Sequence, residues 1–204
     1  AGSGKDLTVQ WLPPVVETLV LKARLLDGAG KVLAQGPVPF TVRDTAPLQV
    51  LGRFGAPSFD ARVLNELLAN SNAVLDWQVT LGKTVTRSET AREAVAAPGL
   101  MVVDAGYFER LPGGARGALL ERVAGGMPLI VLASNATDPG MWSRSMQLNL
   151  KPSAEKPVGT PLAMSPAPFN PAPGVWSPTG DLTWTRQWQK GRIVWLGAAD
   201  WHRY

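Results

Sequence analysis

Residues 100–135 read LMVVDAGYFERLPGGARGALLERVAGGMPLIVLASN, and this stretch decides the fold. It holds two fully apolar runs, 100–103 and 129–133, which predict buried strands. Between them, Pro112 is typical of the first turn of a helix and Gly125-Gly126 of a helix end. A strand, a helix and a second strand in this order predict parallel pairing in a sheet that helices cover on both faces.

The same alternation extends toward the N-terminus. Residues 48–52 and 74–79 predict two further strands, and Ser58 predicts the N-cap of a helix between them. We expect an apolar stripe on that helix to face the core. The stripe consists of Phe59, Val63, Leu64, Leu67 and Leu68. Residues 88–97 predict a short helix capped by Ser88.

The segment 136–180 is rich in proline, which disfavours regular structure. We therefore predict a long loop, with one short strand near 146–150, that folds over the carboxyl edge of the sheet near Ser134. Beyond the loop, residues 182–197 alternate in polarity and turn at Lys190-Gly191, so they predict a β-hairpin.

The first 45 residues predict a small β unit. Residues 19–26 and 31–34 have the pattern of paired strands, and the glycines of 27–30 suit the turn between them. Residues 37–42 predict an edge strand that closes the unit, because prolines cannot donate to a ladder. This pattern resembles the final strands of an immunoglobulin-like sandwich. About 40 residues cannot bury a sandwich core, so we expect the unit to pack on something else or to be a fragment.

The predicted domains are therefore 1–45, the small β unit, and 46–204, the α/β domain with its proline-rich loop. The leader Ala1-Gly2-Ser3-Gly4 is typical of an added linker, so we expect the chain to be a piece of a longer protein. No apolar run approaches the roughly 20 residues that span a bilayer, so we predict no transmembrane segment in this chain.

Composition excludes several kinds of chemistry. The chain has no cysteine, which rules out disulfides, thiolate catalysis and thiolate metal sites. It has one histidine, which gives no ligand set for a metal, and we predict neither a metal nor a cofactor. The net charge of +4 comes from Lys and Arg residues scattered singly, whereas nucleic-acid-binding proteins concentrate them on one stripe. We therefore predict no nucleic-acid partner.

Polar residues that follow the apolar strands form the candidate site, because ligands bind beyond the carboxyl ends of strands in open α/β sheets. The candidate ligand-binding residues are Asp104, Gly106, Ser134, Asn135 and Asp200. Ser134 and His202 are the candidates for catalysis. A serine nucleophile needs a base, and the base needs an acid to orient it, for which Asp104 or Asp200 is available.

The segment Gly52-Arg53-Phe54-Gly55 follows a strand and precedes a helix, as phosphate-binding loops do. It lacks both the GxGxxG and the P-loop patterns, so it is typical of an ordinary turn between strand and helix. Arg53 remains a candidate contact for an anionic ligand or for a carboxylate of a partner.

The order of elements over 47–204 resembles the class I glutamine amidotransferase-like fold, which is flavodoxin-like. Four segments carry the resemblance: 48–52 with Phe59, 102–106, 128–135 and 191–196. The resemblance implies a cysteine at the elbow that follows the strand 129–133, and a His-x-Glu after the last strand. This chain has Ser134 or Asn135 at the elbow, and Tyr204 takes the place of the glutamate in His202-Arg203-Tyr204.

The resemblance points to large bacterial membrane-anchored proteins, and it implies a periplasmic or extracytoplasmic location. The partners it implies are other domains of a longer membrane-anchored polypeptide or other envelope proteins. We therefore predict a catalytically inactive amidotransferase-like domain, a pseudoenzyme that binds a partner or a small ligand. Two alternatives stay open. One is a serine hydrolase that uses Ser134 and His202, and the other is a carbohydrate-binding module built on the C-terminal tryptophans.

Overall fold

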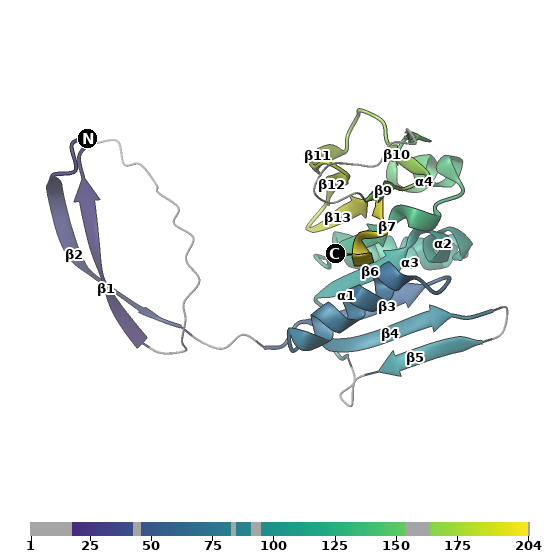
Figure 1. The fold of residues 1–204 in the computed structure, drawn as a ribbon, viewed down its shortest axis with the longest axis horizontal. Coiled ribbons are helices and arrows are strands. Elements are labelled where there is room, and N and C mark those ends of the chain that lie inside the picture. The colour runs from purple at the N-terminus through teal and green to yellow at the C-terminus, as the bar shows by residue number, and fades with distance from the viewer. Residues whose placement is uncertain (1–17, 43–45, 83–84, 91–94, 154–163, 204) are drawn as a thin grey trace. The chain divides into compact units, whose positions relative to one another are not determined.

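The computed structural model describes most of the chain (Figure 1). The described residues are 18–42, 46–82, 85–90, 95–153 and 164–203. The chain divides into two compact units, 1–46 and 47–204. Among the described helices, none has the length and the apolar character needed to cross a membrane.

The first unit contains the hairpin of β1 (Thr18–Leu26) and β2 (Val32–Thr41), which pair antiparallel. Asp27 shapes the turn, because its carboxylate accepts hydrogen bonds from the backbone N–H groups of Ala29 and Lys31, both at 2.9 Å. The predicted strand pair and its turn are confirmed. The edge strand expected at 37–42 is present as the second half of β2, which runs without a break from Val32 to Thr41 and so is not a separate strand.

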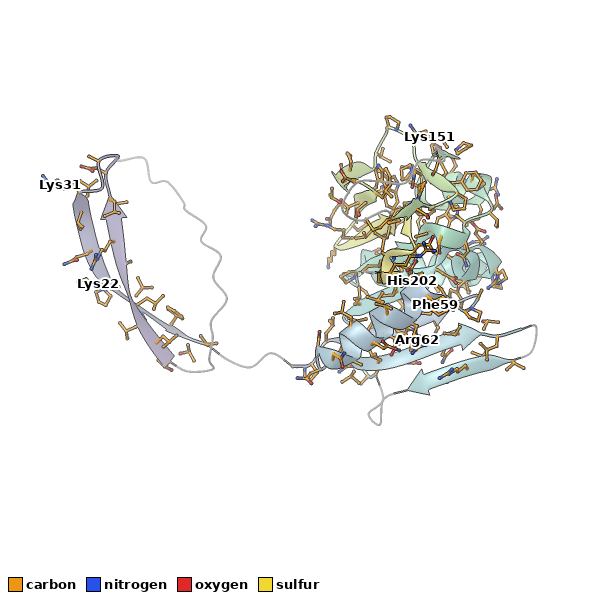
Figure 2. All side chains as sticks on the ribbon, viewed as in Figure 1. Lys22, Lys31, Phe59, Arg62, Lys151 and His202 are labelled. Atoms are coloured by element: carbon orange, nitrogen blue, oxygen red, sulfur yellow. The ribbon has the colours of Figure 1, made fainter. Side chains whose placement is uncertain are left out.

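The hairpin of β1 and β2 has one apolar face. The paired residues on this face are Leu19, Leu21, Ala23 and Leu25 with Phe40, Val38, Gly36 and Ala34. The opposite face mixes the charged side chains of Lys22 and Arg24 with apolar ones such as Val20, which is 65% exposed, and Figure 2 labels Lys22. Leu25 is 54% exposed, so the described residues of this unit leave much of the apolar face uncovered. A two-stranded hairpin is marginally stable by itself.

The second unit is built on an eight-stranded sheet of order β11-β12-β13-β7-β6-β3-β4-β5 (Figure 1). Its strands are β3 (Gln49–Phe54), β4 (Val74–Thr80), β5 (Thr86–Thr90), β6 (Leu100–Asp104), β7 (Leu129–Leu132), β11 (Ser177–Gly180), β12 (Thr183–Trp188) and β13 (Gly191–Leu196). The run from β13 to β4 is parallel, and β5, β12 and β11 add antiparallel edges. The predicted α/β fold with a mostly parallel sheet is confirmed.

Helices cover both faces of this sheet. They are α1 (Phe59–Asn70), α2 (Ala105–Arg110), α3 (Gly113–Ala124) and α4 (Pro139–Met146). Helix α1 packs Ala61, Leu64 and Leu68 on one face, in a cluster with Trp77. The other three helices pack on the opposite face, in a cluster centred on fully buried aromatic side chains such as Trp142.

The predicted helix boundaries are confirmed where side chains or glycines set them. The Ser58 hydroxyl accepts a hydrogen bond from Ala61 N at 3.4 Å and caps α1. Pro112 is the N-cap of α3, and Gly125 is its C-cap. The remaining short elements are η1 (Ala133–Asn135), η2 (Trp201–Arg203), β8 (Leu150–Pro152), β9 (Ser165–Pro166), β10 (Phe169–Pro171) and β14 (Ala198–Ala199).

The helix predicted at 88–97 is wrong in its described residues, because Thr86–Thr90 form β5, which pairs antiparallel with β4, and residues 95–97 are not helical. Threonine favours strands, and β5 forms because β4 is available to pair with it. No local pattern in the sequence indicates this pairing. Residues 91–94 of that predicted helix lie outside the described residues. The expectation that the whole stripe of α1 faces the core is also wrong. Phe59 is 67% exposed and Leu67 is 59% exposed.

The prediction that 136–180 is mainly a loop is wrong for its first part. Asp138 caps α4 by accepting from Met141 N at 2.9 Å, and Pro139 is the first helical residue, where proline is well tolerated. The strand expected near 146–150 is β8, which begins only at Leu150 and pairs with β10. Met146 is fully buried, so this region contributes to the core. Residues 154–163 lie outside the described part.

Candidate functional site

A cavity of about 220 Å³ opens at the carboxyl ends of β3, β6 and β7, and we call it the loop cavity. Its lining includes Phe54, Ser58, Asp104, Leu132, Ser134 and Asn135. The structure thus brings together three of the predicted ligand-binding residues: Asp104, Ser134 and Asn135. Their position is the one at which open α/β sheets usually bind ligands.

Asp104 holds three segments of this edge together, in an arrangement that we call the Asp104 clamp. Its side chain is 3% exposed. The two carboxylate oxygens accept hydrogen bonds from Gly55 N at 3.0 and 2.9 Å, from Tyr107 N at 2.6 Å and from Asn135 Nδ2 at 3.0 Å. The clamp therefore fixes the loop after β3, the start of α2 and the turn η1 relative to one another.

Asn135 extends the clamp to Gly106, since its Oδ1 accepts a hydrogen bond from Gly106 N at 2.9 Å. A Cβ atom at Gly106 would lie 2.8 Å from Asn135 Nδ2, which is closer than real Cβ contacts. Gly106 is not among the residues that line the loop cavity, and its role is to let the Asn135 side chain approach the backbone.

Burial raises the pKa of the Asp104 carboxyl above its ordinary value. The hydrogen bonds from Gly55, Tyr107 and Asn135 act in the opposite direction, because they favour the ionised form, but the loss of solvent is the larger influence. Both oxygens are already engaged by N–H donors of the protein. Asp104 is thus suited to positioning the loops and poorly placed to exchange a proton with a ligand.

His202 lies against the start of α1, where it is held by an aspartate that the sequence analysis did not identify. Asp60 is 6% exposed and accepts from Asp200 N at 2.9 Å and from His202 N at 2.9 Å. The same carboxylate lies 2.8 Å from Nδ1 of the His202 ring. We call this arrangement the Asp60 clamp. An acidic residue in the first turn of a helix is an ordinary preference, so the sequence held no signal for this long-range role.

The structure does not join the two candidates for catalysis. His202 is not among the residues that line the loop cavity, and no hydrogen bond links it to Ser134 within the described part of the chain. Its ring stacks on Phe59, with centroids 5.2 Å apart and planes at 26°, and Figure 2 shows the two side chains next to each other. Asp200, the last predicted ligand-binding residue, accepts from Ser165 Oγ at 2.9 Å and also lies outside the lining of that cavity.

Arg53 has its carboxylate partner within the chain. Its guanidinium contacts the Asp76 carboxylate at 2.6 and 3.2 Å. It also donates to the carbonyl oxygens of Gly52 and Asp76, both at 2.8 Å. These bonds join β3 to β4, so Arg53 stabilises the sheet. Arg53 was predicted to contact an anionic ligand or a carboxylate of a partner, but the carboxylate that it contacts is that of Asp76.

A second hollow of about 590 Å³ lies between α1 and the strand pair β4–β5, and we call it the hairpin cavity. Its lining includes Ser58, Phe59, Arg62, Trp77, Val79 and Arg87. Ser58 also lines the loop cavity, so the two hollows adjoin at the loop before α1. The sequence pattern did not indicate this cavity, because residues 88–97 predicted a helix where the structure has β5.

The described tryptophans are buried or partly buried. Trp195 has no exposed surface and packs edge-on against Trp142, with centroids 5.0 Å apart. Trp184 pairs with Trp195 across β12 and β13, and it packs on the core. These side chains offer no exposed, coplanar pair of indoles on which a sugar could stack. Within the described residues, no group of three or more His, Cys, Asp or Glu side chains could hold a metal ion.

Comparison of this chain with protein-family models, with curated proteins and with solved structures found no match.

Proposed function

We propose that this chain is a non-catalytic, flavodoxin-like domain of the class I glutamine amidotransferase-like kind, and that it binds a small ligand in the loop cavity. One observation carries the proposal. Both oxygens of the Asp104 carboxylate accept hydrogen bonds from N–H groups of the protein, and the Asn135 amide is held in place by one bond to Asp104 and one from Gly106 N. They shape a rigid cavity and leave Ser134 to make the polar contact with the ligand.

Ser134 suits this role because it is partly buried and lines the loop cavity. A hydroxyl can donate one hydrogen bond and accept two, so it recognises a neutral polar group such as a primary amide or an alcohol. Phe54 and Leu132 supply apolar surface beside it. A volume of about 220 Å³ admits a small ligand or the end of a larger one.

We further propose that the domain works outside the cytoplasm, as part of a longer membrane-anchored polypeptide or beside other envelope proteins. The support is the resemblance of 47–204 and the exposure of Leu21, at 43%, and of Leu25, at 54%, in the β1–β2 hairpin, which suits contact with further β structure such as an immunoglobulin-like sandwich.

Two measurements on the purified protein test the non-catalytic proposal. We expect no labelling by a fluorophosphonate probe and no release of ammonia from glutamine. We expect at least one member of a set of small primary amides and alcohols to shift the backbone amide resonances of Gly55 and Ser134. The Ser134→Val variant should lose these shifts. Fluorophosphonate labelling that disappears in Ser134→Ala would overturn the proposal. The proposal would also fail if none of the amides and alcohols shifted the backbone amide resonances of Gly55 and Ser134.

A serine hydrolase is the second candidate, and one specific contact favours it. The Asp60 carboxylate lies 2.8 Å from His202 Nδ1, which is how an acid orients a catalytic imidazole and leaves Nε2 as the base. Asp60 therefore takes the role for which Asp104 and Asp200 were considered. The candidate requires Ser134 to approach His202, and fluorophosphonate labelling that needs both side chains is the result that would select it.

A further inference from the structure

The sheet face on which α1 packs is covered unevenly. Among the described α-helices, α1 alone packs on this face, in the cluster with Trp77 of β4. Ile130 of β7 and Leu196 of β13 point to the same face and are only partly buried. Strands in the middle of a parallel sheet are usually buried on both faces. The part of the face over β7 and β13 therefore leaves apolar strand residues within reach of a ligand.

A cavity of about 440 Å³ lies on this part of the face, and we call it the Trp201 cavity. Its described lining is apolar except for Asp181 and Thr183. The apolar side chains come from α1, β7, β13, η2 and the turn before β12, and they include Leu64, Leu182 and Trp201. An apolar lining with a few polar groups, and a volume within roughly 300–1,000 Å³, is the usual make-up of a small-molecule site.

Hydrogen bonds hold the walls of the Trp201 cavity in place. The Asp60 clamp accepts from the backbone N–H groups of the two residues that flank Trp201, both at 2.9 Å. Across the cavity, Gly197 N donates to Leu182 O at 2.8 Å, which fastens the turn before β12 to the chain after β13. These walls are therefore ordered before a ligand arrives, and a preordered site loses less entropy on binding.

The charge of the lining favours a cation. Asp181 is the one charged residue of the described lining, and its carboxylate has no hydrogen-bond or ion-pair partner among the described residues. The carboxylates that line the other two cavities of this unit, Asp104 and Glu66, are by contrast bonded to groups of the chain. The indole of Trp201 adds a second attraction, because the face of an indole stabilises an ammonium group placed over it.

We propose that the Trp201 cavity is a second binding site, whose ligand is a compact apolar molecule with one ammonium group. The apolar body lies on the partly buried residues of β7 and β13, and the ammonium group faces Asp181 and the indole of Trp201. This site is separate from the Ser134 contact of the loop cavity, although Leu132 lines both cavities.

The probes are 1-adamantanamine, which is protonated at neutral pH, the uncharged 1-adamantanol and the anionic 1-adamantanecarboxylate, each titrated into the isotope-labelled chain. We expect the amine to bind about threefold more tightly than the alcohol, and the carboxylate to bind more weakly than both. The bound amine should shift the Trp201 indole N–H resonance and the methyl resonances of Leu64 and Leu196. Equal affinity for the amine and the alcohol would overturn the choice of a cation. Shifts confined to the hairpin cavity, as at the Trp77 indole, would overturn the site itself.

Asp181→Asn tests the carboxylate without disturbing the fold, because the side chain is exposed and has no partner among the described residues. The variant should bind the amine about threefold more weakly and the alcohol as before. The matched control is Glu121→Gln, an exposed position on α3 outside the lining, which should change neither affinity. An amine preference that survives in Asp181→Asn would contradict the role of this carboxylate.

A second pair of variants tests the position of the site. Leu64→Trp adds bulk on the cavity side of α1 and should weaken the amine and the alcohol by more than about tenfold. Leu67→Trp, on the same helix but outside the lining and 59% exposed, should weaken neither. Unchanged binding in Leu64→Trp would overturn the proposal. Ser134→Val should bind the amine normally, which distinguishes this site from the loop cavity.

Discussion

Among the described residues, two aspartates are buried, and they have similar structural roles with different partners. Asp104 and Asp60 are 3% and 6% exposed, and each accepts hydrogen bonds from backbone N–H groups of segments distant in sequence. The side-chain partner of Asp104 is the neutral amide of Asn135, whereas that of Asp60 is the ring of His202. The first clamp fixes a cavity in the middle of the sheet, and the second fixes the chain after β13. A buried carboxylate beside a cavity is therefore not sufficient evidence for catalysis. In this chain, the hydrogen bonds that hold backbone segments together already explain why the carboxylate is buried and what it contacts.

Removal of the Asp104 carboxylate should have the largest effect. Asp104→Ala leaves the N–H groups of Gly55 and Tyr107 and the amide of Asn135 without their acceptor, and each unsatisfied buried donor costs about 1–3 kcal/mol. We expect the free energy of unfolding to fall by about 4 kcal/mol in urea denaturation. Asp138→Ala, which removes only a helix cap, should cost about 1 kcal/mol and serves as the control. Equal losses in the two variants would contradict a special role for the clamp.

Removal of the Asp60 carboxylate should cost less, because its partners lie nearer to solvent. The His202 side chain is 22% exposed, so its donors can turn to water when Asp60→Ala removes the acceptor. We expect a loss of about 2 kcal/mol. Hydrogen exchange should quicken at the N–H groups of Asp200 and His202 while that of Gly55 keeps its rate. Faster exchange at Gly55 as well would show that the two clamps are not independent.

Removal of the imidazole alone should have a smaller effect. His202→Ala loses one hydrogen bond to Asp60 and the stack on Phe59, but its backbone N–H still bonds to Asp60. We expect a loss of about 1 kcal/mol in thermal or urea denaturation. Arg203→Ala removes an exposed pair with Asp200 at 3.9 Å and should be close to neutral. A loss in His202→Ala as large as that in Asp60→Ala would mean that the ring is the main partner of the clamp.

The smallest effect concerns pH. Because burial raises the pKa of Asp104, the folded protein keeps this proton in a range where the unfolded chain has released it. That range begins at the ordinary carboxyl pKa of about 4 and ends at the raised pKa of the folded state. Within it the folded state binds more protons, so the free energy of unfolding decreases as pH rises.

The measurement is urea denaturation of the wild-type chain and of Asp104→Asn, at intervals upward from about pH 4. We expect the stability of the wild type relative to the variant to decrease with rising pH and then to level off. A relative stability that rises over this range would show that the hydrogen bonds from Gly55, Tyr107 and Asn135 outweigh burial.

The sequence predicted the parallel core because its signals are local. Apolar runs mark β6 and β7, and the helix boundaries follow from Ser58, Pro112 and Gly125, whose effects depend on residues within one turn. The cluster at the loop cavity was also predictable, because the carboxyl ends of neighbouring parallel strands meet at one edge. Asp104 and Asn135 were placed at the site for this reason, although their bonds to backbone N–H groups were not foreseen.

The features that the sequence did not predict depend on contacts between segments that are distant along the chain. Thr86–Thr90 become β5 only because β4 is available to pair with them. The proline count of 136–180 hid α4, since Pro139 occupies the one helical position where proline does no harm. Asp60 meets a histidine 142 positions further along the chain, and no pattern in either segment indicates the other.

The packing of Trp77 over Gly52 has a consequence for how this protein would change over evolutionary time. The two residues pair in the register of β3 and β4, and the indole occupies the space that a side chain at position 52 would need. Neither can be replaced freely while the other stays. In diverging descendants of this chain, the pair should either persist together or change together, toward a smaller residue at 77 and a larger one at 52. Covariation of positions 52 and 77 would thus be a more telling mark of kinship than the apolar runs, which many unrelated sheets share.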